Sequence, residues 1–268
     1  MKIFATLLAL FIFISCASSK EKSYIASTPA APIVRIFLGI PLNDSIDFIR
    51  WNLTLTDNTY TLECNYGIGK PNTNGFYNGG KKIAFTGTFK KENKKYFLQN
   101  GNQILKLAEL NNNLLHILND DNNLLIGGGG WSYALNNLTP SLSDQNNLRA
   151  KQTVLKDSMA FEGRTPCGIP NVIEPGKPCY KLKWYIVLYS NGTYRALGTA
   201  LRKEGGKMGP WKIITGNDGR IFYQLNDEKG DLYVNLLKLD EGILIFTDTK
   251  GNLLVGDLDF SYTLNRKF

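Results

Sequence analysis

Short runs of alternating apolar and polar residues, separated by turn-forming residues, fill most of the chain beyond about residue 30. In the second half of the chain such runs cover 181–189, 193–202, 209–215, 220–225, 231–239, 242–248, 252–257 and 259–266. The segments between them carry Asn-Gly, Asp-Gly and other glycine-bearing pairs, which tolerate the positive φ that tight hairpins require. A period of two with turns at this spacing indicates strands of a sandwich or barrel, and neither half shows the 3.6-residue apolar period of a helix.

The two halves of the chain repeat each other. Residues 123–136 read N-L-L-I-G-G-G-G-W-S-Y-A-L-N and residues 252–265 read N-L-L-V-G-D-L-D-F-S-Y-T-L-N, so eight of fourteen positions are identical without a gap. Ordinary composition would give about one identity by chance. Such self-similarity indicates two copies of one structural unit. Two further blocks match in the same order: 51–60 with 184–194, and 37–41 (F-L-G-I-P) with 161–166 (F-E-G-R-T-P).

These patterns predict an all-β protein of two tandem small up-and-down barrels, meander-like and lipocalin-like, with about eight strands each. The first barrel is expected over 32–138, a linker over 139–159 and the second barrel over 160–268. Closure into a barrel removes the exposed edges of an open sheet. Because the strands are short, we expect side chains to fill each interior. The Gly- and Asn-rich insertion at 67–82 is expected to be a mobile loop.

The chain opens on an apolar run, residues 3–14, which follows a lysine. A bilayer needs about 20 apolar residues, so this run has the length of a secretory signal core instead. The run ends in F-I-S-C, which resembles the lipobox of bacterial lipoproteins, with Phe where Leu is usual. The resemblance implies a signal peptide at 1–15, multiple acylation of Cys16 with chains such as palmitate, and a polar tether at 16–31. A simple secretory signal that leaves Cys16 as a free thiol is the alternative.

Three of the four cysteines lie outside this segment. Cys167 and Cys179 are twelve residues apart in a Pro- and Gly-rich stretch, and an oxidising compartment favours a disulfide between them. Closing so short a loop would contribute on the order of 3 kcal/mol of stability. Cys64 has no obvious partner and is expected to be buried in a strand. A bridge from Cys64 to Cys167 or to Cys179 is the alternative.

The formal charge is +8 and the pI about 9.2. Much of the excess lies at 81–82 and 90–95, which look like turn regions and not like a continuous stripe. A nucleic-acid-binding protein focuses its basic side chains on one face. We therefore expect solvated turn lysines and no nucleic-acid partner, with room for weak attraction to an anionic membrane surface or cell-wall polymer.

The chain contains one histidine, His116, whose counterpart in the second unit is Ile245. A core or partner-facing position on a strand is therefore expected, not a ligand position. A zinc site needs several converging ligands, and a Ser-His-Asp arrangement needs a nucleophile in the right context. We expect no catalytic residue, no resident metal and no cofactor.

The acidic pair Asp257 and Asp259 aligns with Gly128 and Gly130, so the two units share no acidic site. The glycine run 127–130 lacks the Lys-Ser/Thr and the helix of a phosphate loop, and is expected to mark a bulge or a close backbone contact between strands. Aromatic residues recur at matching positions of both units. The tryptophans are expected to anchor the barrel cores in preference to forming a carbohydrate-stacking face: Trp51, Trp131, Trp184 and Trp211.

Residues 161–167 (F-E-G-R-T-P-C), followed by an L-Y-S-N-G-T-Y hairpin and a G-P-W strand, resemble the NlpE-type (CutF-like) outer-membrane lipoproteins. The family opens on Pro-Cys-x-x-Cys. Here Cys167 matches the first cysteine, Pro170 stands at the second, and the next cysteine is Cys179. The resemblance implies NlpE-like barrels at the outer membrane and a role in copper homeostasis or envelope stress.

The leading interpretation is a non-enzymatic binding, adaptor or stress-sensing module of the cell envelope. Its binding surfaces would be the barrel mouths, the 67–82 loop and the loop between Cys167 and Cys179. Its partners would be the membrane, through the lipid, and an envelope protein or cell-wall component. The alternative is a copper- or redox-responsive sensor that uses Cys167 and Cys179. An enzyme acting on a cell-wall glycan is a third hypothesis, without a supporting motif.

Overall fold

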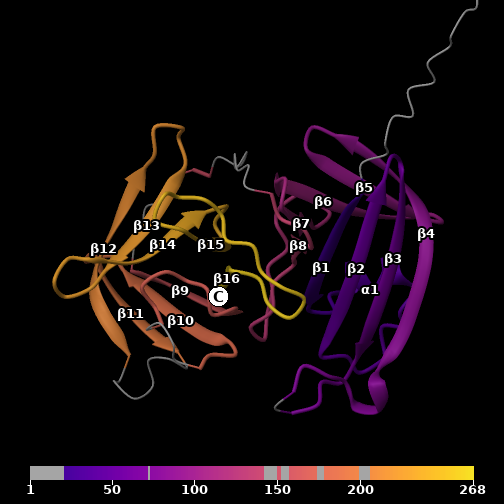
Figure 1. The fold of residues 1–268 in the computed structure, drawn as a ribbon, viewed down its shortest axis with the longest axis horizontal. Coiled ribbons are helices and arrows are strands. Elements are labelled where there is room, and N and C mark those ends of the chain that lie inside the picture. Colours follow the sequence, from indigo (N-terminus) through magenta and orange to yellow (C-terminus); the bar gives the residue numbers. More distant parts are fainter. Residues whose placement is uncertain (1–20, 72, 142–149, 152–156, 174–177, 199–205) are drawn as a thin grey trace, which may run out of the picture.

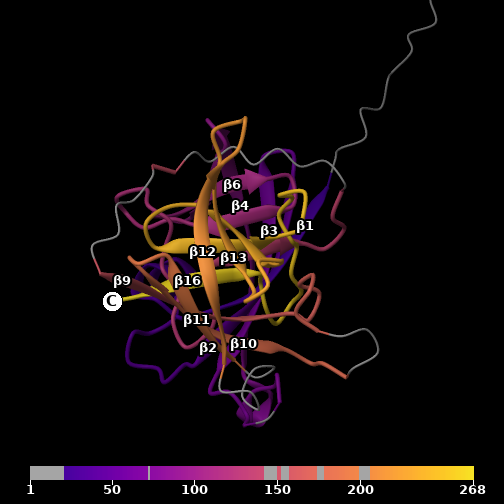
Figure 2. The same cartoon turned by 90° about the vertical axis from the view of Figure 1, so that its left-hand side faces the viewer.

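The computed structural model describes residues 21–71, 73–141, 150–151, 157–173, 178–198 and 206–268, which form two closed antiparallel barrels (Figure 1). The expected signal peptide and the expected lipidation site, Cys16, lie outside the described residues. In each barrel consecutive strands are neighbours, so the expected pair of tandem eight-stranded meanders is confirmed. Seen along the line that joins the barrels, the second lies in front of the first (Figure 2).

Barrel 1 contains eight strands, and β1 closes it by pairing with both β2 and β8. A short helix, α1, lies between the first two strands, and a 3-10 turn, η1, precedes the fourth. The bounds are β1 (Lys22–Thr28), α1 (Pro32–Leu38), β2 (Phe48–Thr56), β3 (Thr59–Gly67), η1 (Tyr77–Gly79), β4 (Lys81–Glu92), β5 (Lys95–Asn100), β6 (Gln103–Asn111), β7 (Leu114–Ile117) and β8 (Ala134–Asn137).

Barrel 2 has the same meander, closed by pairing of β9 with β10 and β16. The run expected at 252–257 is not a strand, because only Leu253 forms a bridge there, and the eighth strand is β9 instead. The bounds are β9 (Ser158–Thr165), β10 (Leu182–Tyr189), β11 (Thr193–Gly198), β12 (Lys207–Thr215), β13 (Ile221–Asn226), β14 (Leu232–Lys238), β15 (Ile243–Thr247) and β16 (Thr263–Lys267).

The first barrel begins at Lys22, so the boundary expected at residue 32 and the tether expected over 16–31 are wrong in this stretch. β1 reads K-S-Y-I-A-S-T, and Tyr24 and Ala26 point into the barrel, 0% and 1% exposed. Three of its residues are Ser or Thr and one is Lys, so its composition resembles a linker. Pairing on both edges and the burial of alternate side chains make it a strand.

The match of residues 37–41 with 161–166 is also wrong, because 37–41 belong to the end of α1 and the turn after it. The indole Nε1 of Trp51 donates to Thr28 Oγ1 at 2.8 Å, and Nε1 of Trp184 donates to Thr165 Oγ1 at 2.9 Å. These equivalent hydrogen bonds align β1 with β9. The helix is therefore an insertion in the first unit.

In each barrel the connection from the first strand to the second covers one end. In barrel 1 this connection contains α1, whose Phe37 is buried with its ring centroid 6.0 Å from that of Phe85. In barrel 2 it is the disulfide-bonded loop, whose buried Ile169 packs into the core. The two units thus cover the same end of the barrel with different local structures.

The two barrels pack through the same outer face. Alternate side chains of β6 and β7 point away from barrel 1 and join the apolar core cluster of barrel 2. They are Ala108 and Leu110 on β6, Leu114 on β7 and Leu118 directly after it, and their counterparts are Leu237 on β14, Leu239 directly after it, and Ile243 and Thr247 on β15. In Figure 1 these strands face each other at the junction of the barrels. Burial of this shared apolar surface holds the two units together.

His116 lies on β7 between Leu114 and Leu118, so its ring points toward barrel 2. It is fully buried, and Nδ1 lies 2.9 Å from the carbonyl oxygen of Ile117. Because a carbonyl only accepts hydrogen bonds, Nδ1 carries the proton. Burial lowers the pKa of His116 to about 4, so the ring is neutral at pH 7. The expected core or partner-facing position is confirmed.

Replacing His116 with Ile, its counterpart in the second unit, should make the free energy of unfolding fall less as the pH is lowered. The unfolded chain binds a proton at this position near pH 6.5 and the folded protein near pH 4, so wild type loses stability as pH falls through this window. Between pH 7 and pH 5 the unfolding free energy of the variant should gain about 2 kcal/mol on wild type. Urea unfolding at both pH values measures it, and a pH-independent difference contradicts the buried neutral ring.

Cys167 and Cys179 form the expected disulfide, with a Cα–Cα distance of 6.0 Å, and Cys64 is a free thiol buried on β3. Burial raises the pKa of Cys64, which keeps this thiol protonated and inert. The alternative bridges to Cys64 are therefore not present.

The double variant Cys167→Ala/Cys179→Ala should lower the free energy of unfolding by about 3 kcal/mol, because the open loop has more freedom in the unfolded chain. Urea unfolding with and without dithiothreitol measures this change. The reductant should destabilise wild type by a similar amount and leave the variant unchanged. Equal stabilities of the oxidised and reduced wild-type protein would contradict a stabilising role of the loop closure.

Candidate functional site

The repeated segments meet each other between the barrels. The backbone N–H of Gly127 donates to Asn265 Oδ1 at 2.7 Å, and that of Gly256 donates to Asn136 Oδ1 at 2.9 Å. Each asparagine is the last residue of one repeat and each glycine the fifth residue of the other. Reciprocal contacts of this kind define an isologous interface with approximate two-fold symmetry. The strongest self-similarity in the sequence therefore encodes the contact between the two units.

Matching residues of the two repeats also contact each other near the approximate two-fold axis. Ser132 and Ser261 occupy matching positions, and their hydroxyl oxygens lie 2.6 Å apart in a buried hydrogen bond. At Gly127 a side chain would approach the carbonyl oxygen of Trp131 to 2.0 Å, so only glycine fits there. The close backbone contact expected for the glycine run is present, but it lies at the barrel–barrel junction and not between paired strands.

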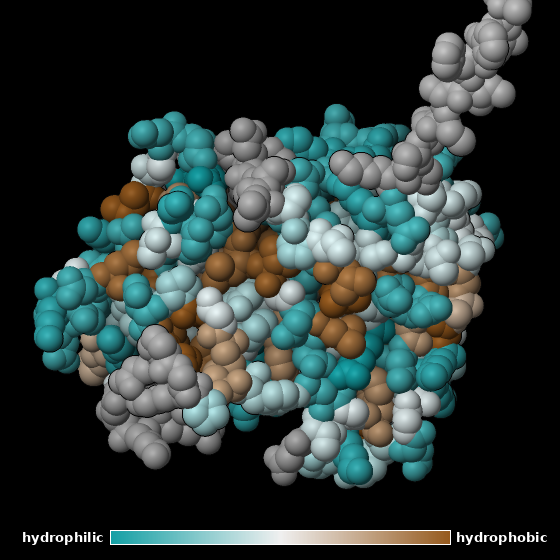
Figure 3. Space-filling view, viewed as in Figure 1, coloured by the Kyte–Doolittle hydropathy of each residue, from teal (hydrophilic) through white to brown (hydrophobic). Residues whose placement is uncertain are grey.

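A cleft of about 290 Å³ opens beside this junction, and it is the candidate functional site. Four cationic side chains and two carboxylates contribute to its walls. Barrel 1 supplies Ser27, Asp47, Phe48, Gly69, Lys70, Pro71, Thr73, Asn74 and Trp131, and barrel 2 supplies Arg164, Lys181, Lys183, Asp259 and Phe260. Figure 3 shows apolar patches near the junction of the barrels on one face, within a largely hydrophilic surface.

An aromatic column forms one wall of the cleft. The ring of Phe48 lies 4.3 Å from that of Phe76 and 5.0 Å from that of Trp131, centroid to centroid, and both pairs are stacked. The guanidinium of Arg164 lies 4.4 Å from the centroid of the Trp131 ring. Trp131 therefore belongs to the cleft and not to a barrel core as expected. With Phe48 and Arg164 against the ring, Trp131 offers no free platform for a sugar. Trp51 and Trp184 do lie in their barrel cores.

The three cations of barrel 2 lie together in the cleft, and the carboxylates that act on them, Glu162 on Arg164 and Asp259 on Lys181, do so without forming an ion pair in the described residues. Arg164 on β9 stands directly opposite Lys183 on β10, and like charges in that position destabilise a sheet. Burial lowers the pKa of Arg164, and burial together with the charges of Arg164 and Lys183 lowers the pKa of Lys181. Within the described ranges none of the three forms an ion pair. An incoming anion would relieve this repulsion.

The two carboxylates of the cleft are engaged by barrel 1. Asp259 reaches across the junction, where its Oδ1 lies 2.5 Å from Arg50 Nη2 and its Oδ2 accepts a hydrogen bond from Asn74. Asp47 Oδ2 accepts the backbone N–H of Gly69 at 2.7 Å. Because both acids hold loops in place, neither is presented as a general base.

Structure and expectation agree only partly on the binding surfaces. The 67–82 loop supplies several cleft residues, and within it Lys70 N donates to Gly75 O at 2.9 Å. The described residues of the loop between Cys167 and Cys179, and the barrel end under α1, do not line the cleft. Arg164, Lys181 and Lys183 were missed by sequence reasoning. The sequence signal was the pair Lys181 and Lys183, two basic residues two positions apart in a strand-forming segment without nearby acidic residues.

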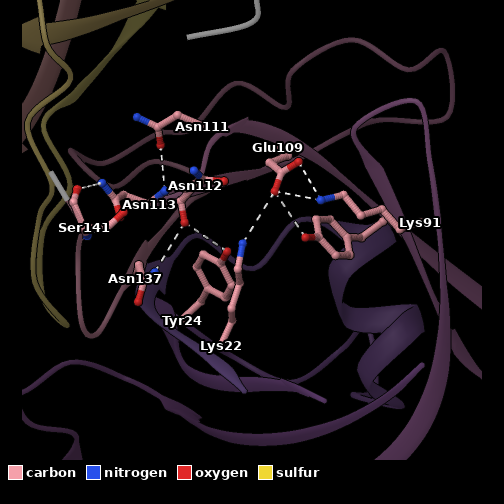
Figure 4. A network of polar contacts seen from close by, with 10 residues as sticks. Lys22, Tyr24, Lys91, Glu109, Asn111, Asn112, Asn113, Asn137 and Ser141 are labelled. Carbon is pink, nitrogen blue, oxygen red and sulfur yellow. Dashed lines mark hydrogen bonds and ion pairs between the residues drawn. The ribbon is translucent and has the colours of Figure 1, made fainter. Parts of the chain in front are cut away.

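A second cluster of charged residues surrounds Glu109 inside barrel 1 (Figure 4). The buried Glu109 carboxylate lies 2.7 Å from Lys91 Nζ and 3.9 Å from Lys22 Nζ, and it accepts a hydrogen bond from the Tyr96 hydroxyl at 3.3 Å. Its counterpart in barrel 2 is the buried Lys238, which pairs with a glutamate. Because the charge is reversed between units and partnered in both, we interpret these clusters as structural ion pairs.

Metal chemistry finds no support in the described part of the chain. It contains no group of three or more His, Cys, Asp or Glu side chains arranged to hold a metal ion. Cys167 and Cys179 are bonded to each other, and a disulfide does not present the thiolates that metals bind.

Comparisons of the chain with protein-family models, with curated proteins and with solved structures found no match. The similarity to NlpE-type lipoproteins therefore stays an interpretation of the sequence motifs. Over the residues that the structure covers, no helix has the length and apolar character to cross a bilayer. The function has to be argued from the geometry of the cleft.

Proposed function

We propose that this protein is a lipid-anchored module of the cell envelope that binds a negatively charged ligand, without catalysis, in the cleft between its two barrels. One observation carries the proposal: Arg164 and Lys181, both half-buried, and the exposed Lys183 line one cleft, and none of the three forms an ion pair in the described structure. Retaining like charges side by side lowers stability, which is a common mark of a site that an anion completes.

The scaffold suits binding. Both barrels are closed, so the molecule has no free sheet edge in either barrel to extend a partner strand. The walls of the cleft come from strand ends and from loops held by hydrogen bonds, which gives a preformed site. The envelope location follows from the lipobox-like motif at Cys16, and a disulfide fits an oxidising compartment.

The alternative, a copper- or redox-responsive sensor resembling NlpE, depends on Cys167 and Cys179. Metal binding through this pair would require prior reduction, because only thiolates are ligands. The loop they close covers the end of barrel 2 and contributes its buried Ile169 to the core. A stabilising role explains the pair without a sensing function.

The double variant Lys181→Gln/Lys183→Gln should weaken anion binding at least about tenfold, because each charge-assisted hydrogen bond contributes about 1.5–3 kcal/mol. Calorimetry on the chain from residue 16 onward, with Cys16→Ser to prevent acylation, would titrate inorganic phosphate, citrate and polygalacturonate. Wild type should bind at least one of them.

The matched control is Lys90→Gln/Lys94→Gln, which removes the same charge from exposed positions around the β4–β5 hairpin. Its affinities should equal those of wild type. Equal weakening in both double variants would mean that net charge and not the cleft governs binding. Absence of binding to every probe would refute the proposed function.

A further inference from the structure

The approximate two-fold symmetry allows the two halves of the junction to be compared position by position. Arg50 on β2 and Lys183 on β10 correspond, because each immediately precedes the tryptophan that bonds to the equivalent threonine. Asp259 in the second repeat corresponds to Gly130 in the first. The cation of one half thus has its carboxylate partner, Asp259, 2.5 Å away, while the matching position of the other half has no side chain.

Gly130 also makes room for another cation. A Cβ atom at Gly130 would come within 2.6 Å of Arg164 Cγ, so the Arg164 side chain fills the space that a side chain at Gly130 would need. Arg164 corresponds to Ser27 in the alignment of β9 with β1, and Ser27 Oγ bonds to the carbonyl oxygen of Leu258 at 2.8 Å. Relative to its twin, this half of the junction has gained a cation and lost a carboxylate.

We propose that the ligand supplies this missing carboxylate: the cleft binds a carboxylate group between Arg164, Lys181 and Lys183, in the role that Asp259 performs for Arg50. The inference rests on the proposed function and names its ligand class. Arg164 lies over the Trp131 ring, and among the described residues its guanidinium donates no hydrogen bond, so its N–H groups are available for a two-point contact with a planar carboxylate.

The symmetry of the junction, and not the net charge of the cleft, favours a carboxylate over a phosphate. Four cations and two carboxylates line the cleft, and the group that pairs with Arg50 in the twin half is the planar carboxylate of Asp259. A cleft of about 290 Å³ admits a group as large as one acidic sugar. A uronic acid, either free or as a unit of an anionic glycan, has this size and carries this group.

The test is a calorimetric titration of the Cys16→Ser chain with glucuronate, with inorganic phosphate and with neutral glucose. One glucuronate should bind per chain, phosphate at least about tenfold more weakly, and glucose should give no signal. Arg164→Gln should weaken glucuronate at least about tenfold, since it removes a charge-assisted contact. Oligogalacturonates of increasing length distinguish a free uronic acid from a uronate unit of a glycan. An affinity that rises faster than the number of uronate units indicates a glycan ligand. An affinity that stays constant per uronate unit indicates the free acid.

The variant Asp259→Gly tests the equivalence of the two halves. Glycine, the residue at the matching position 130, removes the carboxylate from Arg50 and vacates its place, so a second glucuronate should bind and the stoichiometry should rise from one to two. A stoichiometry that stays at one overturns the equivalence of the two halves. Phosphate binding without glucuronate binding overturns the carboxylate inference and leaves the anion-binding function standing, whereas no binding of glucuronate, phosphate, citrate or polygalacturonate overturns both.

Discussion

The reciprocal contact between the two repeats is the constraint on which the rest of the molecule depends. Two asparagine side chains, Asn136 and Asn265, each cap a backbone N–H of the opposite barrel, and this exchange sets the register of an otherwise apolar junction. Apolar surfaces alone associate without direction. The paired amides and the serine contact on the axis give the junction one orientation, which places the cleft residues of both barrels side by side.

The duplication is symmetric where it holds the units together and asymmetric elsewhere. One barrel end is covered by a helix and the other by a cross-linked loop. A buried glutamate in one barrel is a buried lysine in the other. Likewise, Gly130 stands beside the cleft where the second repeat has Asp259. Once two copies are joined in one chain, each position is free to change in one copy only, and this freedom allows a single cleft with unlike walls to form on a near-symmetric frame.

Much of the fold could be predicted because alternation along a strand depends on local residues. The tandem meanders followed from runs such as Trp184 to Tyr189, in which burial alternates strictly. β1 was missed because Ser and Thr can fill inward positions when a tryptophan N–H needs an acceptor, and composition does not show that need. The cleft could not be predicted, because Phe48, Lys70, Trp131 and Arg164 are far apart in the sequence and only the packing of the barrels brings them together.

The early start of β1 has a geometric consequence. Only five residues separate Cys16 from Lys22, and an extended chain advances about 3.5 Å per residue, so their Cα atoms can be at most about 21 Å apart. With Cys16 acylated as proposed, barrel 1 would lie close to the lipid headgroups and would not extend far from the membrane. A protein anchored in this way would sample only the layer next to its membrane, and it would meet neighbours on that surface and polymers that reach it.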